Sequence, residues 1–476
     1  MAKFNSTAST RTVNHEGHSA YAMQPRIKLI TQVLTSFINE QKFYGDNTRE
    51  MKELIPNVIR QDPQFVSNLA VFARCVFHMR SVSHVLTGFL ANVPEGKPYV
   101  RRTVEGVTLR GDDATEILSF YLSEFGKPIP NSLRRALKDV FATFDAYTLA
   151  KYKGEGHTVK MRDLLRICRP HPETPEQSAM WKQLLDGTLP PAYTWETELS
   201  SNGNNKETWE KLIDSGRCGY MGLLRNLRNI INANPDNLDK VLEKLSDHEA
   251  VRHSRQLPFR FLSAYKNLPA GAGKKVTDAL ENAVTAACEN VPKLPGRTVI
   301  AVDVSGSMSS NVSAKSEIRC CEIGMMLGMI ANRICDDAIF YTFNYRISQK
   351  QIPSAGILYS TVHEAMASGG TDMHLPFRQM LTDKIRCDRI IIISDNECNS
   401  PFQFRQPVQT IADQYRKASG NDIWVHAIDL AGYGTQQFSG PKTNIIAGWS
   451  EKVFDFILLA EQGEHRLEKT IAEYTW

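Results

Sequence analysis

Five oxygen-bearing side chains occupy three short loops in the last third of the chain. They are Asp303, Ser305, Ser307, Thr371 and Asp395. Two of these loops directly follow apolar runs, 298–302 and 389–393, and the third contains two adjacent glycines. A hard cation such as Mg²⁺ prefers about six oxygen ligands and usually keeps several waters. We therefore predict that Ser305, Ser307 and Thr371 contact a divalent cation, while Asp303 and Asp395 supply negative charge by hydrogen bonding to its waters.

The loops must be brought together by the elements that precede them. From Arg297 onward, apolar runs alternate with amphipathic stretches. The predicted strands cover residues 298–302, 338–343, 389–393 and 423–428, and the predicted helices cover 316–332, 375–381 and 407–418. Such alternation is typical of a doubly wound α/β sheet with parallel strands. Ligands bind to these sheets beyond the carboxyl ends of the strands. The loops that follow the two apolar runs are expected at this edge.

The pattern D-x-S-x-S followed by a later Thr and Asp resembles the metal-ion-dependent adhesion site of von Willebrand factor A domains. All five positions match. The resemblance implies a Rossmann-like A domain over residues 297–476, holding Mg²⁺, with Mn²⁺ or Ca²⁺ as alternatives. The competing interpretation is that Ser-Gly-Ser only turns the chain and caps a helix. Three loops in the expected order, each after the expected element, favour the metal site.

Sequence patterns that would indicate catalysis are weaker than the pattern for the metal site. An aspartyl-phosphate enzyme of the haloacid class would need an aspartate where Ser305 stands. No G-x-S-x-G motif occurs, and the segment 271–275 departs from a P-loop because Lys275 is neither Ser nor Thr. His15 and His18 form an H-x-x-H pattern, which alone is a poor indicator of zinc. We therefore predict that the chain is not an enzyme.

Length and composition bound the class of protein. A chain of 476 residues is too long for one hydrophobic core, so two domains are expected. Its apolar fraction of 42% and charged fraction of 23% are ordinary for a soluble protein. The nine cysteines contain no C-x-x-C pair, and neither a secretory signal nor a bilayer-spanning run is found. A cytoplasmic protein without a membrane partner is the prediction.

The region before the α/β pattern is predicted to be helical. Apolar residues recur there at helical spacing between Pro, Gly and Asn breakers. The predicted helices cover 24–39, 65–77, 81–90, 114–125, 132–144, 159–168, 221–231 and 238–245. An α-solenoid of stacked helix pairs fits, although no fixed repeat length is found. With the boundary near 291–296, we expect an N-terminal arm over 1–20, a helical domain over 21–293 and an α/β domain over 297–476.

Positive charge is concentrated in the helical part. Residues from Arg297 onward carry 17 basic and 20 acidic side chains, which leaves 39 basic and 32 acidic before them. Three predicted helices place basic side chains opposite an apolar face, and each face is either simply solvated or bound to phosphate groups. These basic residues are Arg134, Arg135 and Lys138; Lys160, Arg162, Arg166, Arg169 and His171; and Arg225 and Arg228. His78 and His84 are either further contacts or structural histidines.

The segments 74–84, 163–166 and 220–227 resemble the Ro autoantigen (TROVE) family, as does the order of a helical domain before an A domain. The resemblance covers nearly the whole chain. It implies a monomeric ring of HEAT-like repeats closed by the A domain. It also implies Y-like small noncoding RNA on the basic outer surface, where residues 160–171 are the candidates, and single-stranded 3′ ends of misfolded RNA in the central hole. Arg169 stands where the family leads us to expect a histidine.

The sequence therefore leaves three hypotheses for the function. The first is a non-enzymatic RNA scaffold in RNA quality control, which in bacterial relatives is understood to tether an exoribonuclease (polynucleotide phosphorylase) through a Y-like RNA. The second is a metal-dependent protein-adhesion scaffold acting through the A domain. The third is a phosphoesterase that uses the same cation. RNA co-purification, metal-dependent peptide binding and Mg²⁺-dependent RNA cleavage distinguish them.

Overall fold

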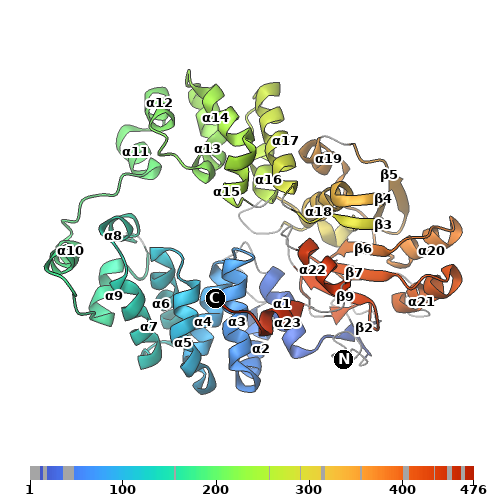
Figure 1. Ribbon diagram of the computed structural model, residues 1–476, viewed down its shortest axis with the longest axis horizontal. Coiled ribbons are helices and arrows are strands. Elements are labelled where there is room, and N and C mark those ends of the chain that lie inside the picture. Colours follow the sequence, from blue (N-terminus) through green and yellow to red (C-terminus); the bar gives the residue numbers. More distant parts are fainter. Residues whose placement is uncertain are drawn as a thin grey trace. The chain divides into compact units, whose positions relative to one another are not determined.

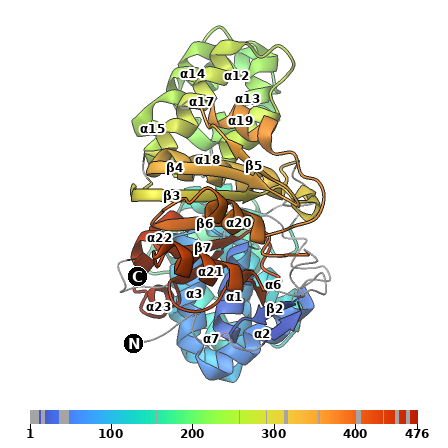
Figure 2. The same ribbon diagram turned by 90° about the vertical axis from the view of Figure 1, so that its right-hand side faces the viewer.

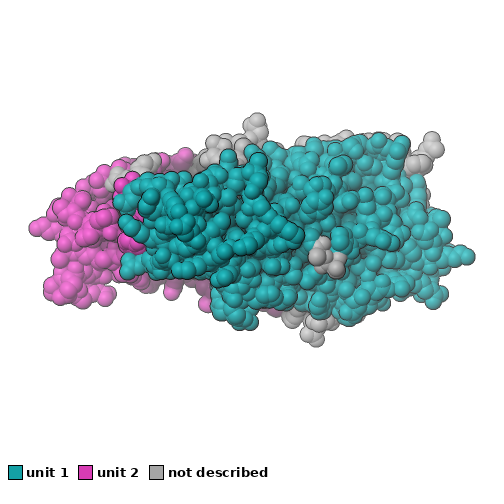
Figure 3. Space-filling view, turned by 90° about the horizontal axis from the view of Figure 1, so that it is seen from above, with its two compact units in different colours: residues 1–38, 202–467 teal, residues 39–201, 468–476 magenta. Residues whose placement is uncertain are grey.

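The chain forms two compact units. The computed structural model describes residues 11–13, 19–35, 48–154, 157–256, 258–289, 291–311, 317–353, 356–399, 407–433, 435–447, 453–461 and 467–476. Unit 1 comprises residues 1–38 and 202–467, and unit 2 comprises residues 39–201 and 468–476 (Figure 3). The division falls inside the region that sequence patterns treat as one helical domain, because the helices after residue 201 pack with the α/β part.

Unit 2 is a stack of helices in which near neighbours in sequence lie side by side (Figure 1). Its elements are α2 (Thr48–Gln61), α3 (Pro63–Cys75), α4 (Ser81–Asn92), η2 (Pro94–Tyr99), α5 (Val100–Val107), α6 (Gly111–Phe125), α7 (Asn131–Ala142), α8 (Ala146–Lys151), α9 (Met161–Cys168), α10 (Pro175–Asp186), α11 (Trp195–Asn202) and α23 (Leu467–Ala472). Apolar side chains spaced three and four residues apart bury one face of α7 and α9, as the sequence pattern predicts. In α3 and α4 every residue over 65–74 and 82–91 is buried, so these two helices form the centre of the stack.

A buried carboxylate joins α3, α4 and α6. Asp113 is fully buried and accepts hydrogen bonds from Arg74 Nη2 at 2.9 Å and His84 Nε2 at 3.0 Å, besides an ion pair with Arg80. Burial opposes its ionisation, but the hydrogen bond from His84 and the charges of Arg74 and Arg80 hold the pKa of Asp113 below its ordinary value. His84 is therefore a structural histidine, while His78 is half-buried.

Asp113→Ala is expected to destabilise unit 2 by about 3–5 kcal/mol, because it leaves the buried Arg74 guanidinium without its carboxylate. Hydrogen exchange of the amides in α3 and α6 measures this effect. Asp112→Ala is the control, since Asp112 is more exposed and pairs with Arg80 and Arg110 at the surface. Equal exchange in the two variants would contradict the structural role of Asp113.

The C-terminal segment packs on α3 and α5. Asn68 Nδ2 donates to the carbonyl of Ala472 at 2.8 Å, and the Phe72 and Tyr474 rings meet edge to face at 5.2 Å. The Arg102 guanidinium lies 4.3 Å from the centre of the Trp476 ring. The end of the predicted A domain therefore belongs to the core of the helical unit, although α22, which precedes it, belongs to unit 1.

Unit 1 contains further helices and an α/β domain. Its first elements are β1 (Arg11–Val13), β2 (Ser19–Ala22) and α1 (Pro25–Thr35), followed by α12 (Lys206–Asp214), α13 (Tyr220–Ala233), α14 (Leu238–Ser246), α15 (His248–Ser254), α16 (Pro258–Lys266) and α17 (Lys274–Cys288). These helices pack on the α/β part, and polar contacts support the packing. Lys266 Nζ lies 2.8 Å from both carboxylate oxygens of Glu322, and Glu281 accepts the N–H groups of Leu358 and Tyr359.

The α/β domain is built on a six-stranded sheet of order β5-β4-β3-β6-β7-β9, visible in Figures 1 and 2. All neighbouring strands are parallel except the edge pair β4–β5. Its elements are β3 (Leu294–Asp303), η3 (Gly306–Ser309), α18 (Cys320–Ile334), β4 (Cys335–Phe343), β5 (Ile347–Lys350), α19 (Ile357–Glu364), α20 (His374–Thr382), β6 (Arg389–Ser394), α21 (Val408–Ser419), β7 (Trp424–Asp429), β8 (Thr435–Gln436), β9 (Thr443–Ala447) and α22 (Val453–Glu461).

Helices cover both faces of this sheet. On one face, α20 and α21 pack against alternate strand residues, and Met23 and Ile27 near and in α1 join the same core. On the other face lies α18, where a Cβ at Gly328 would come within 2.6 Å of the Val302 side chain, so that only glycine allows this approach. The doubly wound fold predicted from the sequence is confirmed, and β5 and β9 are added at its edges.

Two buried side chains, Arg389 and His426, and the half-buried Glu461 link β6 and β7 to α22. Arg389 binds the Glu461 carboxylate through Nε and Nη2, and His426 Nε2 lies 3.1 Å from Glu461 Oε1. Burial would raise the pKa of Glu461, but the hydrogen bonds from His426 and Arg389 lower it to about 2. Burial also lowers the pKa of His426, which therefore stays neutral in the folded protein at pH values where it would otherwise be protonated.

We expect this cluster to contribute to acid unfolding. The pKa of Glu461 is lower when folded than its ordinary value of 4.5, so its stabilisation is complete above about pH 4.5 and is lost as the pH falls towards about 2. Melting temperatures measured against pH should fall less steeply across that window in Glu461→Gln than in the unmodified protein. Parallel pH profiles would show that this carboxylate does not contribute.

Candidate metal centre and basic helix faces

Three loops at the carboxyl edge of the sheet carry the predicted metal ligands. Asp303 ends β3, with Ser305 and Ser307 in the turn after it; Asp395 follows β6; and Thr371 precedes α20. Strands β3 and β6 are adjacent and parallel, with Val302 opposite Ile393 in their register. The carboxyl ends of both strands therefore meet at one edge, as the sequence predicts.

Hydrogen bonds hold the three loops together. The Ser305 N–H donates to Asp303 Oδ1 at 2.8 Å, and the hydroxyl oxygens of Ser305 and Ser307 lie 3.1 Å apart. Ser394 Oγ, at the end of β6, donates to Asp303 Oδ2 at 2.7 Å. The Gly306 N–H donates to the Gly369 carbonyl at 2.7 Å, which joins the first loop to the glycine loop. The predicted ligands thus belong to one bonded cluster.

The cluster is rich in buried oxygen and negative charge. Asp303, Ser305, Thr371 and Asp395 are all buried, and Ser307 is half-buried. Burial, together with the charge of Asp395, raises the pKa of Asp303. The Thr371 hydroxyl is buried and has no hydrogen-bond partner among the residues that the structure describes. Two buried carboxylates that repel each other and an unpaired buried hydroxyl, on loops joined by hydrogen bonds, are groups that a hard cation would satisfy.

Asp429 is a third buried carboxylate at this edge, and our sequence reasoning missed it. It ends β7, opposite Ser394 in the register, and its Oδ1 accepts the N–H groups of Ala431 and Gly432 at 2.9 and 2.8 Å. Its Oδ2 has no partner among the described residues. Burial, with a smaller effect from Asp395, raises the pKa of Asp429 to about 7. An aspartate directly after the predicted strand 423–428 was the available signal.

The basic residues predicted on α7 and α9 lie on neighbouring helices of unit 2. The two helices pack together. Burial raises the pKa of Cys168 on α9 to about 12, and the positive charge of Arg134 on α7 opposes this rise. Arg134, Arg135, Arg166, Arg169 and His171 are exposed, whereas Lys138, Lys160 and Arg162 are half-buried. Arg166 Nη1 lies 3.8 Å from Asp163 and remains 60% exposed. Arg169 caps α9 in the left-handed region, with φ of 48°.

Arg225 and Arg228 lie on α13 of unit 1 and are exposed. Burial and the charge of Arg225 lower the pKa of Arg260 on α16, so a third basic side chain lies near this pair. The candidates therefore form two groups, one in each unit. Sequence spacing had indicated the helix faces but not Arg260.

Comparison with known proteins places these features in a family. A TROVE domain model matches residues 12–190 and 187–275, and a Ro60 vWA domain model matches residues 297–433. The chain belongs to the Ro/TROVE family. The RNA-binding protein RO60 of Deinococcus radiodurans is 26% identical over 317 residues, covering 56% of this chain and 59% of that protein. The RO60 protein of Caenorhabditis elegans is 29% identical over 245 residues, 46% of this chain and 35% of that one.

The chain is also similar to part of a much longer protein. Telomerase protein component 1 of Rattus norvegicus is 25% identical over 327 residues, which are 51% of this chain but only 12% of that protein. Among solved structures, the Ro protein of Deinococcus radiodurans matches with a TM-score of 0.66 and 18% identity, over 92% of this chain and all of that one. This last likeness shows that the two proteins share a fold.

The A domain also contains a cluster of side chains with metal-binding atoms that the sequence did not single out. Asp372, His374 and Cys398 are buried, and their ligand atoms lie within 4.8 Å of one another. Asp372 Oδ1 already accepts both the backbone N–H of His374 at 3.0 Å and its Nδ1 at 2.7 Å. These bonds fix the start of α20 directly after Thr371, so the cluster supports the glycine loop.

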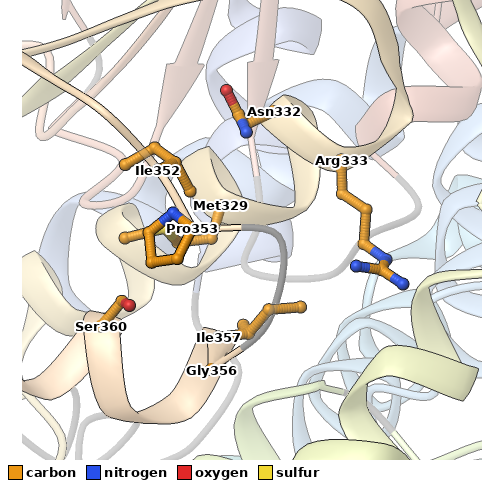
Figure 4. Close-up of a pocket in the computed structure, with 8 residues that line it drawn as sticks. All are labelled: Met329, Asn332, Arg333, Ile352, Pro353, Gly356, Ile357 and Ser360. Carbon is orange, nitrogen blue, oxygen red and sulfur yellow. The ribbon is translucent and has the colours of Figure 1, made fainter.

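A cavity of about 300 Å³ lies between α18 and the segment that leads into α19 (Figure 4). Met329, Ile352 and Ile357 form its apolar lining. Asn332 and Arg333 also border it, but Figure 4 shows their side chains pointing in different directions. Small-molecule sites usually present several convergent polar groups, so this cavity gives no support for one.

Two remaining predictions concern zinc and membranes. His15 and His18 lie outside the described residues. In the part of the chain that the structure describes, no helix has both the length and the apolar character that a bilayer crossing requires.

Proposed function

We propose that this chain is a non-enzymatic RNA-binding protein that holds small noncoding, Y-like RNA on the basic face of α7 and α9. The observation that carries the proposal is the packing of these two helices, which gathers eight candidate basic residues on neighbouring elements. Exposed Arg and Lys side chains neutralise backbone phosphates and release counterions, which gives steep salt dependence. Family relatives named RNA-binding protein RO60 support RNA as the partner.

A second RNA class is proposed for the same protein. Single-stranded 3′ ends of misfolded RNA would enter the central opening of a closed, monomeric ring of HEAT-like helices. Such ends present phosphates and unstacked bases, whereas an intact duplex hides its bases and is too wide for a narrow opening. In this role the protein would act in cytoplasmic RNA quality control, or present RNA to an exoribonuclease such as polynucleotide phosphorylase.

We also propose that the A domain holds one divalent cation, Mg²⁺ in preference to Mn²⁺ or Ca²⁺. The hydroxyls of Ser305, Ser307 and Thr371 would bind it, and Asp303 and Asp395 would orient its waters. The unpaired, buried Thr371 hydroxyl is the observation in favour. A bound cation would supply an electrophilic centre that accepts an anionic oxygen. The same observation keeps a metal-dependent protein-adhesion scaffold as the second candidate.

RNA binding can be tested with the purified full-length chain. We expect RNA to co-purify, and an RNA hairpin with a single-stranded 3′ tail to bind more tightly than the same hairpin with a blunt end. Sequencing of the co-purified RNA would identify its class. Absence of binding to both hairpins at moderate salt would overturn the proposal. Mg²⁺-dependent cleavage of the RNA would instead favour a phosphoesterase, and peptide binding lost in Asp303→Asn would favour adhesion.

A further inference from the structure

The tip of the β4–β5 hairpin lies against the glycine loop of the metal centre. The Asn344 carbonyl accepts the N–H of Asp372 at 2.9 Å, and Asn344 Nδ2 donates to the Ser368 carbonyl at 2.8 Å. These bonds flank Thr371, the residue with the unpaired buried hydroxyl. The hairpin tip is therefore fixed beside the proposed cation ligands by two hydrogen bonds that need no ion.

Tyr345 stands at this tip with its ring against Gly369. A Cβ at Gly369 would overlap the Tyr345 ring, and the φ of +74° at this position also favours glycine. The Gly369 carbonyl in turn accepts the N–H of Gly306, between the two metal-loop serines. The Tyr345 residue nevertheless remains 56% exposed. An aromatic surface is thus held in contact with the metal loop and is open to solvent.

Arg346 adds a positive charge to the same rim. Its guanidinium carbon lies 5.6 Å from the centre of the Tyr345 ring. The residue is exposed, and it makes no ion pair with any residue that the structure describes. An aromatic ring lies against the glycine loop that carries the unpaired Thr371 hydroxyl, and a guanidinium without an ion-pair partner among the described residues lies beside that ring.

We propose that Tyr345, Arg346 and the metal centre together bind one nucleotide of single-stranded RNA. The base stacks on Tyr345, Arg346 contacts the phosphate, and a non-bridging phosphate oxygen completes the coordination of the cation. The inference rests on the proposed RNA-binding function and adds a contact separate from the basic face of α7 and α9.

An RNA nucleotide fits this rim better than an acidic peptide does. A carboxylate would satisfy the cation and Arg346, but it would leave the exposed Tyr345 ring unused. A single-stranded nucleotide offers an anionic oxygen and a flat base together, and bases in such strands stack readily on aromatic side chains and on guanidinium groups. A duplex keeps its bases in the helical stack and could use only the charged part of the site.

The test measures binding of a fluorescent uridine decamer to the full-length chain, with Mg²⁺ or with EDTA. We expect Mg²⁺ to tighten binding about tenfold, and Tyr345→Ala to remove this gain, as for the loss of one stacked base. Tyr345→Phe should keep the gain because its ring still stacks. Tyr359→Ala is the matched control, since Tyr359 is also 56% exposed but lies on α19 and stacks on His363.

Direct contact between phosphate and cation has its own readout. Replacing non-bridging phosphate oxygens by sulfur should weaken binding in Mg²⁺ and restore it in Mn²⁺, a softer ion that accepts sulfur more readily. A decamer affinity that changes neither with Mg²⁺ nor in Tyr345→Ala would overturn the inference while leaving the proposed function intact. Failure of every RNA to bind would overturn both. Tyr345-dependent binding of a polyglutamate octamer that displaces the decamer would assign the site to an acidic protein instead.

Discussion

Asp303→Asn is expected to weaken Mg²⁺ binding about 100-fold, the upper range for residues that orient metal ligands. Asparagine keeps an oxygen that can accept the Ser305 N–H and an amide group that can meet the Ser394 hydroxyl, so the loop should retain its shape. The proposed site would lose the negative charge that attracts the cation. Isothermal titration of the full-length chain with Mg²⁺ measures the change in affinity.

The same substitution should stabilise the protein when no cation is present. Asp303 is fully buried and faces the charge of Asp395, so its ionised form is unfavourable without a counterion. Thermal melting in EDTA should therefore show a higher midpoint for Asp303→Asn, and the order of the two proteins should reverse as Mg²⁺ is added. Asp383→Asn, an exposed position of the same domain, serves as the control. A lower midpoint in EDTA would show that the loop depends on the carboxylate for its structure alone.

The double variant Arg162→Ala with Arg166→Ala is expected to weaken the binding of structured small RNA at least several-fold at moderate salt. If each side chain neutralises one phosphate, the slope of log affinity against log salt should become shallower by about 1.8, or about 0.9 per contact. Filter binding across a salt series measures both quantities. An Ala substitution that removed only packing would lower affinity without changing this slope.

Arg252→Ala is a suitable control for this pair. Arg252 is 57% exposed and bonded to Glu249 three residues before it, much as Arg166 is 60% exposed with Asp163 three residues before it. It differs in belonging to α15 of unit 1, whereas α7 and α9 belong to unit 2. A salt slope that stays unchanged in the double variant, or that changes equally in Arg252→Ala, would refute the assignment of the α9 face.

The candidate metal centre shows how much of a site can be predicted from a local sequence pattern. Asp303, Ser305, Ser307, Thr371 and Asp395 were identified without coordinates, because parallel strands deliver their carboxyl ends to one edge of the sheet. Asp429 and the Tyr345–Arg346 rim were not identified. Their positions depend on which strands neighbour β6 and β4, and strand order is a property of the assembled sheet.

In the helical region, too, some features followed from the sequence pattern and others did not. Periodicity located the long helices and their basic faces, because one buried stripe per helix repeats at 3.6 residues. It did not indicate that α7 and α9 are neighbours, nor that Arg225 and Arg228 belong to a different compact unit. The short strands β1 and β2 were also missed, since three or four residues carry too little pattern and β2 pairs with the distant β8.

The sequence by itself determined the family and the doubly wound α/β domain, and it supplied the candidate metal-loop residues and the basic helix faces. All of these are encoded by residue types at short, fixed spacings. The tertiary structure alone decided that α1 joins the α/β core, that the C-terminal segment packs on α3, and that His84 forms a hydrogen bond with Asp113. These contacts join residues far apart in the chain, and they are selected by burial and charge pairing in the folded protein, which no local spacing records.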